Sequence, residues 1–375
     1  MPHLGFLRAI CCLLGALSYP LGALSYPLGT DTGFSPRLFT PPAEVRIERL
    51  ASQDGEAILL RFWGEAHAPR AIVLGVHGFT DYGRGFAHLA SQLPALDDIP
   101  TMVLSFDQRG FGESASRGRW AGSAAMLADL DSVIAWIDRN HPRAALFLIG
   151  ESMGAALVLT ALQRSSMVTQ ERLRGVVLLA PAIWGWSSMP WYQRLGLELG
   201  SALWPSLQLS GRGARQLGIR PTDDEAVAAY LARDPRMLRE VSIAMLVGLT
   251  DLMESASAAR IPAQLPTLIA IGRQDRVIPV AAVCVWANGQ AVPGPRESWL
   301  VQEQGYHMLT RQRASGEVLA AISHWMRALL AEQVEAASLP IQPSASAPRS
   351  APIRVAPDGG LSISARGAAL GKLCR

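Results

Sequence analysis

The segment Gly150–Gly154, which reads GESMG, constrains this chain more than any other part of its sequence. The apolar run Ala144–Ile149 precedes it, and the helix-like run Ala155–Leu162 follows it. A sharp strand-to-helix turn of this kind pushes its serine out of the sheet, where a base can activate the weakly nucleophilic hydroxyl. We therefore expect Ser152 to be a nucleophile at the end of a parallel strand. The alternative is a strand-to-helix turn without chemistry.

Two further candidate groups follow in the order that such a nucleophile requires, an acid and then a histidine. Asp275 lies in the loop after the strand-like run Pro266–Ile271, and His307 comes just after the strand-like run Ser298–Gln302. We expect Asp275 to orient the imidazole of His307, which would take the Ser152 proton and return it to the leaving group. The alternatives are a loop carboxylate that caps the next helix and a loop histidine with ordinary polar partners.

The negative oxygen of a tetrahedral intermediate needs backbone N–H donors, one directly after the nucleophile and one in the loop after an earlier strand. The first would be Met153. The second would be Phe79, which follows the apolar run Ala71–Val76. We expect His77 in the same loop to shape the backbone rather than to transfer protons. Asp107 precedes the nucleophile in the chain, so we expect it to be structural as well.

Continuous apolar runs separated by helical patterns predict parallel strands that are buried on both faces. The expected fold is an α/β core over residues 43–181 and 263–333. Residues 182–262 interrupt the alternation above the carboxyl ends of the strands, and we expect them to form a helical cap. The cap would line an acyl or alkyl pocket with some of its four tryptophans, Trp184, Trp186, Trp191 and Trp204. The alternative is that these tryptophans only pack the cap onto the core.

The two ends of the chain differ from its middle. In residues 1–30, the basic Arg8 is followed by an uncharged apolar stretch, which is typical of a secretory signal or a membrane tether. The seven residues LGALSYP occur twice in this stretch. We expect export or membrane association, with a cytoplasmic protein as the alternative. Residues 340–375 are rich in Ala, Ser, Pro and Gly without periodicity, which predicts a disordered tail.

Composition excludes several classes of function. The net charge of +3 is small for 375 residues and the basic residues are scattered, so nucleic acid is not an expected partner. The four cysteines are Cys11, Cys12, Cys284 and Cys374, and none has metal-ligand spacing. We therefore expect no metal, no disulfide framework, and an inert core thiol at Cys284.

In its motifs the chain resembles the α/β-hydrolases of the monoacylglycerol lipase and lysophospholipase group, the serine aminopeptidase-type family. The motifs that carry the resemblance are HGF at 77–79, DQRGFGES at 107–114, GESMG at 150–154, GRQD at 272–275 and GYH at 305–307. The resemblance implies a mostly parallel eight-stranded sheet with a helical cap, and ester hydrolysis without a cofactor. Many members have histidine where this chain has Glu151 and Phe111, which leaves the chemistry intact.

The sequence thus predicts a serine carboxylester hydrolase that cleaves monoacylglycerol or lysophospholipid-like esters through an acyl-enzyme. An acyltransferase or a peptidase could use the same residues, and a binder without catalysis is the remaining alternative. The expected partner is a small ester or lipid, with association at a membrane surface as an additional expectation. The sequence does not indicate an oligomeric state.

Overall fold

The computed structural model describes residues 41–374 except 45, 65–66, 94–95, 97, 165–171, 211–217, 291–295 and 339–362. The signal-like segment at residues 1–30 lies outside the described residues. So do residues 340–362 of the tail that was predicted to be disordered.

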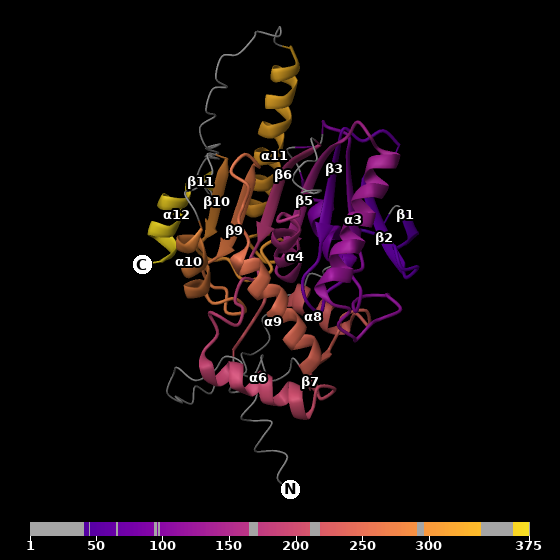
Figure 1. Cartoon of the computed structure of the whole chain (residues 1–375). Helices are drawn as coiled ribbons and strands as arrows, with labels where there is room; N and C mark the ends of the chain where they lie inside the picture. The colour runs from indigo at the N-terminus through magenta and orange to yellow at the C-terminus, as the bar shows by residue number, and fades with distance from the viewer. Residues whose placement is uncertain are drawn as a thin grey trace, which may run out of the picture.

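A twisted sheet of nine strands forms the centre of the molecule, in the order β1-β2-β4-β3-β5-β6-β9-β10-β11 (Figure 1). The neighbours in the stretch β4-β3-β5-β6-β9-β10 pair in parallel. The pairs β1 with β2, β2 with β4, and β10 with β11 are antiparallel. The strands are β1 (Arg46–Ala51), β2 (Ala57–Gly64), β3 (Ala71–Val76), β4 (Thr101–Phe106), β5 (Ala145–Glu151), β6 (Leu173–Leu179), β9 (Thr267–Gly272), β10 (Glu297–Gln302) and β11 (Ile363–Ser364). The mostly parallel sheet predicted from the sequence is confirmed, and β11 adds a strand to the eight that were expected.

Both faces of the sheet are covered by helices, which explains why the strands are continuously apolar. In β3, Ile72, Leu74 and Val76 belong to one apolar cluster, and Ala71 and Val73 belong to the other. The first cluster includes α3 (Ser123–Asn140), α4 (Met153–Ala161), α10 (Val280–Gly289) and α12 (Arg366–Leu373). The second includes α2 (Ala87–Ala90) and α11 (Ser315–Ser338), and the 3₁₀ turn η1 (Gly83–Phe86) leads into α2.

The described residues between β6 and β9 form a layer beyond one end of the sheet, at the bottom of Figure 1. This layer contains α6 (Trp191–Leu203), α8 (Glu225–Arg233), α9 (Ile243–Ala258) and the small antiparallel pair of β7 (Gln208–Ser210) with β8 (Glu240–Ser242). It lies beyond the carboxyl ends of the parallel strands, where the candidate site residues are. Among the described residues, none of the helices combines the length and apolar character that crossing a bilayer requires.

The C-terminal residues 363–374 do not fit the predicted disordered tail. They form β11, which pairs with Trp299 and Leu300 of β10, and α12, which packs against the sheet through Ala369 and Leu373. We call residues 363–374 the C-terminal strap. The prediction failed because only a few apolar side chains anchor the strap and they are separated by small residues without a strong period.

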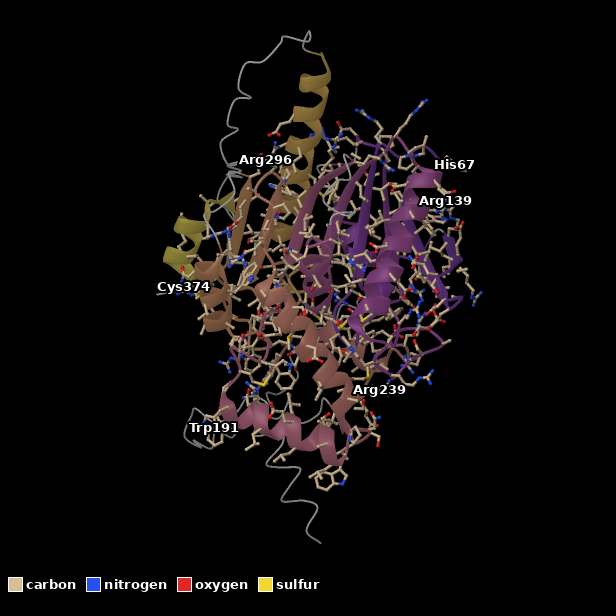
Figure 2. All side chains as sticks on the ribbon, in the orientation of Figure 1. His67, Arg139, Trp191, Arg239, Arg296 and Cys374 are labelled. Carbon is tan, nitrogen blue, oxygen red and sulfur yellow. A yellow bond between two sulfur atoms is a disulfide. The ribbon has the colours of Figure 1, made fainter. Side chains whose placement is uncertain are left out.

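The strap is held by a disulfide between Cys284 of α10 and Cys374, with the two Cα atoms 5.9 Å apart (Figure 2). The expectations of an inert core thiol and of no disulfide were therefore wrong. A buried ion pair between Arg366 of α12 and Glu297 of β10 adds to the attachment. The two cysteines are 90 residues apart in the chain, and no sequence spacing indicates such a pairing.

Removing the disulfide should destabilise the fold without destroying it. Cys284→Ser and Cys374→Ser should each lower the free energy of unfolding by about 2–4 kcal/mol, because the open chain regains loop entropy in its unfolded state. Urea unfolding followed by circular dichroism measures this change. A reductant should destabilise the wild-type protein by the same amount and leave the double variant unchanged; equal stability of oxidised and reduced wild type would contradict the disulfide.

Candidate active site

Ser152 stands at a strained turn between β5 and α4. Its backbone has φ 55° and ψ −115°, in a region that non-glycine residues rarely adopt. A Cβ at Gly154 would lie 1.9 Å from the carbonyl oxygen of Val76, and one at Gly150 would lie 2.6 Å from the backbone of Ala155. Only glycine therefore permits the close approach of strand and helix that forms this turn.

Asp275 and His307 meet in the loops that follow β9 and β10. Nδ1 of His307 lies 2.7 Å from Oδ2 of Asp275, and both side chains are buried. The other carboxylate oxygen of Asp275 accepts hydrogen bonds from the backbone N–H groups of Val277 and Ile278. The carboxylate is thus fixed on one side by its own loop, and it directs Nε2 of the imidazole away from itself.

Close packing of two glycines brings these loops together. A Cβ at Gly272 would lie 2.4 Å from the carbonyl oxygen of Gly305, so the two loops touch backbone to backbone. The N–H of Gln274 donates to the carbonyl of Gly305 at 2.8 Å. The motifs that the sequence singled out as GRQD and GYH are therefore one structural unit.

No hydrogen bond joins Ser152 Oγ to His307 in this structure, in which both residues are described. The structure thus brings the acid and the base together, and the candidate nucleophile lies on a separate buried turn between β5 and α4. A bond between nucleophile and base that tightens only with substrate is compatible with general base catalysis.

The environment of His307 favours its protonated form. Burial works to lower the pKa of the imidazole, but the charge of Asp275, its hydrogen bond and the nearby carboxylate of Glu151 outweigh burial and raise the pKa above its ordinary value. Such a histidine is a stronger base than a free imidazole, which is the property required to accept a hydroxyl proton.

Two backbone N–H groups next to Ser152 have no acceptor. Neither Phe79 nor Met153 donates its backbone N–H to any described residue. Met153 opens α4, where N–H groups have no partner within the helix. A Cβ at Gly78 would lie 3.3 Å from Cβ of Ser152, so the Phe79 loop runs directly beside the serine. Met153 is buried and Phe79 is partly buried. Unpaired donors in such positions are rare, and this arrangement is typical of an oxyanion-binding site.

His77 has the structural role that the sequence predicted. Its Nε2 accepts the backbone N–H of Gln108 at 3.0 Å, so its Nδ1 carries the proton and donates to the carbonyl of Gly78 at 2.8 Å. Burial lowers the pKa of His77, which keeps the ring neutral. Asp107 likewise holds structure, because its carboxylate accepts from Arg61 and from the backbone N–H of Gly83.

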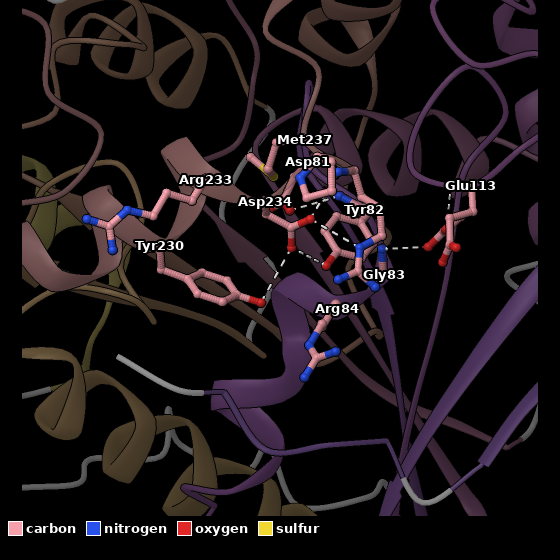
Figure 3. A network of polar contacts seen from close by, with 12 residues as sticks. Asp81, Tyr82, Gly83, Arg84, Glu113, Tyr230, Arg233, Asp234 and Met237 are labelled. Atoms are coloured by element: carbon pink, nitrogen blue, oxygen red, sulfur yellow. Dashed lines mark hydrogen bonds and ion pairs between the residues drawn. The ribbon is translucent and has the colours of Figure 1, made fainter. Parts of the chain in front are cut away.

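A polar network attaches the layer of α6, α8 and α9 to the Phe79 loop (Figure 3). Tyr82 donates its hydroxyl to Asp234 at 2.6 Å, and the N–H of Leu238 donates to the carbonyl of Thr80 at 2.9 Å. Burial works to raise the pKa of Asp234, but hydrogen bonds from Tyr82 and Arg236 outweigh it and lower the pKa. The carboxylate therefore stays charged and keeps its hydrogen bond to Tyr82.

Sequence reasoning missed a buried arginine beneath the site. Nη2 of Arg311 lies 2.5 Å from Oε2 of Glu151 and 2.6 Å from Oδ2 of Asp81. The available signal was Glu151 itself, because a carboxylate next to a buried nucleophile requires a cation. Nothing in the sequence near Arg311 identifies it as that cation.

The tryptophans predicted to line a pocket divide between two environments. Trp184 packs against the apolar core, whereas Trp191 and Trp204 at the two ends of α6 are 76% and 48% exposed. Figure 2 shows Trp191 on the outer side of the α6 layer. Trp191 forms an exposed apolar row with Leu195, Leu199 and Leu203, which we call the α6 stripe.

One hollow of the described surface lies far from Ser152. A hollow of about 580 Å³, lined by Arg70, His141 and Arg143 among others, lies at the amino ends of β3 and β5, the opposite end of the sheet from Ser152. Within the part of the chain that the structure describes, no three His, Cys, Asp or Glu side chains are grouped to hold a metal ion.

Comparison with known proteins agrees with this fold. The family described as serine aminopeptidase, S33, matches residues 67–313. Monoglyceride lipase of Rattus norvegicus is 23% identical over 286 residues, which cover 75% of this chain and 90% of that protein. Monoacylglycerol lipase of Mycolicibacterium smegmatis is 27% identical over 237 residues, 62% and 79% of the two chains. A soluble variant of monoglyceride lipase from Saccharomyces cerevisiae, solved with a substrate analogue, has the same fold, with a TM-score of 0.60. Its sequence is 19% identical, and the match covers 80% of this chain and 99% of that chain.

The raised pKa of His307 predicts how reactivity at Ser152 depends on pH. The base must be neutral, so reactivity is lost as pH falls through the pKa of His307. The rate of covalent labelling by a fluorophosphonate should fall with a midpoint above the ordinary histidine value of about 6.5. Asp275→Asn removes the charge that raises this pKa, so it should move the midpoint to lower pH and slow labelling on the order of 10³-fold or more. An unmoved midpoint in Asp275→Asn would contradict the pairing.

Proposed function

The chain belongs to the serine aminopeptidase, S33, family of α/β-hydrolases, and we propose that it is a serine carboxylester hydrolase that cleaves monoacylglycerol or lysophospholipid-like esters. One observation carries the proposal: the strained Ser152 turn lies beside two unpaired N–H groups, with a buried imidazole–carboxylate pair in the neighbouring loops. Strain and unpaired donors cost stability, so a turn without chemistry is a poor explanation for their coincidence.

The chemistry proceeds in two acyl-transfer steps. Oγ of Ser152 attacks the ester carbonyl while His307 takes its proton, and Asp275 stabilises the imidazolium. The N–H groups of Phe79 and Met153 bind the oxygen that becomes negative. His307 then gives the proton to the departing alcohol, which leaves an acyl-serine. A water molecule, deprotonated by His307, releases the fatty acid and restores Ser152.

The surroundings of the site support a substrate with an apolar acyl group. Met153 and Phe79 belong to the same apolar cluster as Met245, Leu252 and Met253 of α9. We assign the catalytic core to residues 43–181 and 263–333 and the cap to residues 182–262. The monoglyceride lipases among the relatives support a glycerol ester. Transfer of the acyl group to an alcohol, or peptide cleavage, would use the same residues, and the products distinguish them.

The α6 stripe supports docking at a lipid surface. Its apolar side chains follow helical spacing at Trp191, Leu195, Leu199 and Leu203, on the side of α6 opposite to the buried Leu197. Arg194 and Glu198 form an ion pair beside the stripe. A row of exposed apolar side chains is costly in water but stable at the boundary of a bilayer, where such a substrate also resides.

We also propose that the protein is exported. The signal-like residues 1–30 support this, and so does the disulfide between Cys284 and Cys374, because disulfides persist mainly in oxidising compartments. A protein recovered from the cytosol with both thiols free would contradict export.

Replacing the proposed nucleophile should abolish turnover. Ser152→Ala should lower kcat on short p-nitrophenyl esters by about 10⁴-fold or more while the fold persists. The control is Ser132→Ala, which removes a hydroxyl on α3 that bonds only within its helix. With the wild-type protein, kcat/KM should increase along a series of glycerol and lysolipid esters of increasing acyl length. Retained activity in Ser152→Ala would remove Ser152 from its role.

Replacing the α6 stripe should weaken binding to lipid. Full insertion of one large apolar side chain into the bilayer contributes about 1.5–3 kcal/mol to the free energy of binding. The double substitution Trp191→Ser with Leu195→Ser should therefore weaken binding to phosphatidylcholine vesicles roughly 10-fold or more. Hydrolysis of a soluble short ester should not change. Val285→Ser is the control, because Val285 is also an exposed apolar residue, at 68%, but lies on α10. Vesicle binding unchanged by the double substitution would contradict docking through α6.

A further inference from the structure

Three charged side chains are buried together beneath the proposed site: Asp81, Glu151 and Arg311. One nitrogen of the guanidinium, Nη2, lies 2.5 Å from Glu151 and 2.6 Å from Asp81, so a single arginine pairs with two carboxylates that are 70 positions apart in the chain. We call these residues the Arg311 cluster. Removing three charges from water costs free energy unless they are paired, and apolar side chains in the same space would cost less.

The three members of the cluster come from three different segments of the proposed site, since Glu151 ends β5 and the other two lie in loops. Glu151 directly precedes Ser152. Asp81 follows Phe79 by two residues, and Arg311 follows His307 by four. The guanidinium therefore connects the turn of the nucleophile, the loop of one oxyanion donor and the loop of the base.

The backbone around the cluster is shaped to admit these contacts. A Cβ at Gly85 would lie 2.7 Å from Oδ2 of Asp81 and 3.1 Å from Nη1 of Arg311, so a larger residue would push the pair apart. The carbonyl of Arg311 accepts the hydroxyl of Thr222, and the N–H of Met308 donates to the carbonyl of Pro221. Residues 221–222 lie in the proposed cap, which thus holds the loop that carries Arg311.

We propose that Arg311 is a positioning residue that fixes the relative placement of Ser152, His307 and Phe79 through Glu151 and Asp81. The inference rests on the proposed function, since it assigns those three residues their roles. A guanidinium suits this task, because its planar group reaches two carboxylates in fixed directions, whereas a lysine ammonium is a single point charge. Placement matters, because a displacement of about 1 Å can cost on the order of 10²-fold in rate.

The cluster also acts on the base through its charge. The charged groups that face His307 are Asp275 in the loop after β9, Glu151 at the elbow and Arg311 in its own loop. Asp275 and Glu151 favour the imidazolium, and Arg311 opposes it. Removing the charge of Glu151 should therefore lower the pH at which His307 titrates, an effect that a purely structural role would not produce.

Kinetics of variants test the proposal. Arg311→Met should lower kcat on the order of 10²-fold with a smaller change in KM, and Arg311→Lys should recover only part of the loss. Glu151→Gln should move the acidic limb of the kcat/KM profile to lower pH. Arg366→Met is the matched control, since it removes an equally buried pair with Glu297 at the amino end of β10. It should lower stability and leave the pH profile unchanged.

The outcomes separate failure of the inference from failure of the function. Wild-type kcat in a folded Arg311→Met, or an unmoved acidic limb in Glu151→Gln, would overturn the positioning role while Ser152→Ala remains inactive. If Arg311→Met does not fold, Arg311→Lys and Asp81→Asn decide, since each should lower kcat below the wild-type value, and wild-type kcat in both would overturn the role. If the wild-type protein hydrolyses no ester, NMR titration of the His307 imidazole in wild type and Glu151→Gln still measures the coupling. Equal titration in both would overturn it.

Discussion

The backbone turn at Ser152 is the constraint on which the rest of the site depends. Its positive φ is unfavourable for a serine, and it persists because Gly150 and Gly154 let β5, α4 and the end of β3 approach more closely than any side chain would allow. The same approach brings the Phe79 loop against the serine and leaves two backbone N–H groups without partners. Strain, close packing and unpaired donors are thus consequences of one geometry.

Charge then organises what the backbone brings together. The carboxylate of Asp275 orients His307, and the guanidinium of Arg311 joins Glu151, next to Ser152, to Asp81. These pairs are buried, so water screens them little and their geometry is correspondingly strict. The layer of α6, α8 and α9 is attached to the Phe79 loop through the hydrogen bond from Tyr82 to Asp234.

The sequence predicted those features that local pattern and chain order encode. The strands and the sheet follow from continuous apolar runs, and Asp275 and His307 were located by their position after the last strands. The disulfide of Cys284 with Cys374 and the pairing of Arg311 with Glu151 join residues far apart in the chain, so no periodicity reports them. The outward orientation of Trp191 escaped prediction because its hydrophobicity fits a buried and an exposed position of a cap equally well.

The most direct test of this account is the crystal structure of the protein after reaction with an alkyl fluorophosphonate. A phosphorus atom should be bonded to Oγ of Ser152, with one phosphonyl oxygen about 2.7–3.1 Å from the backbone nitrogens of both Phe79 and Met153. Nε2 of His307 should face the adduct. An adduct on another residue, or an oxygen that points away from both nitrogens, would contradict the proposed mechanism.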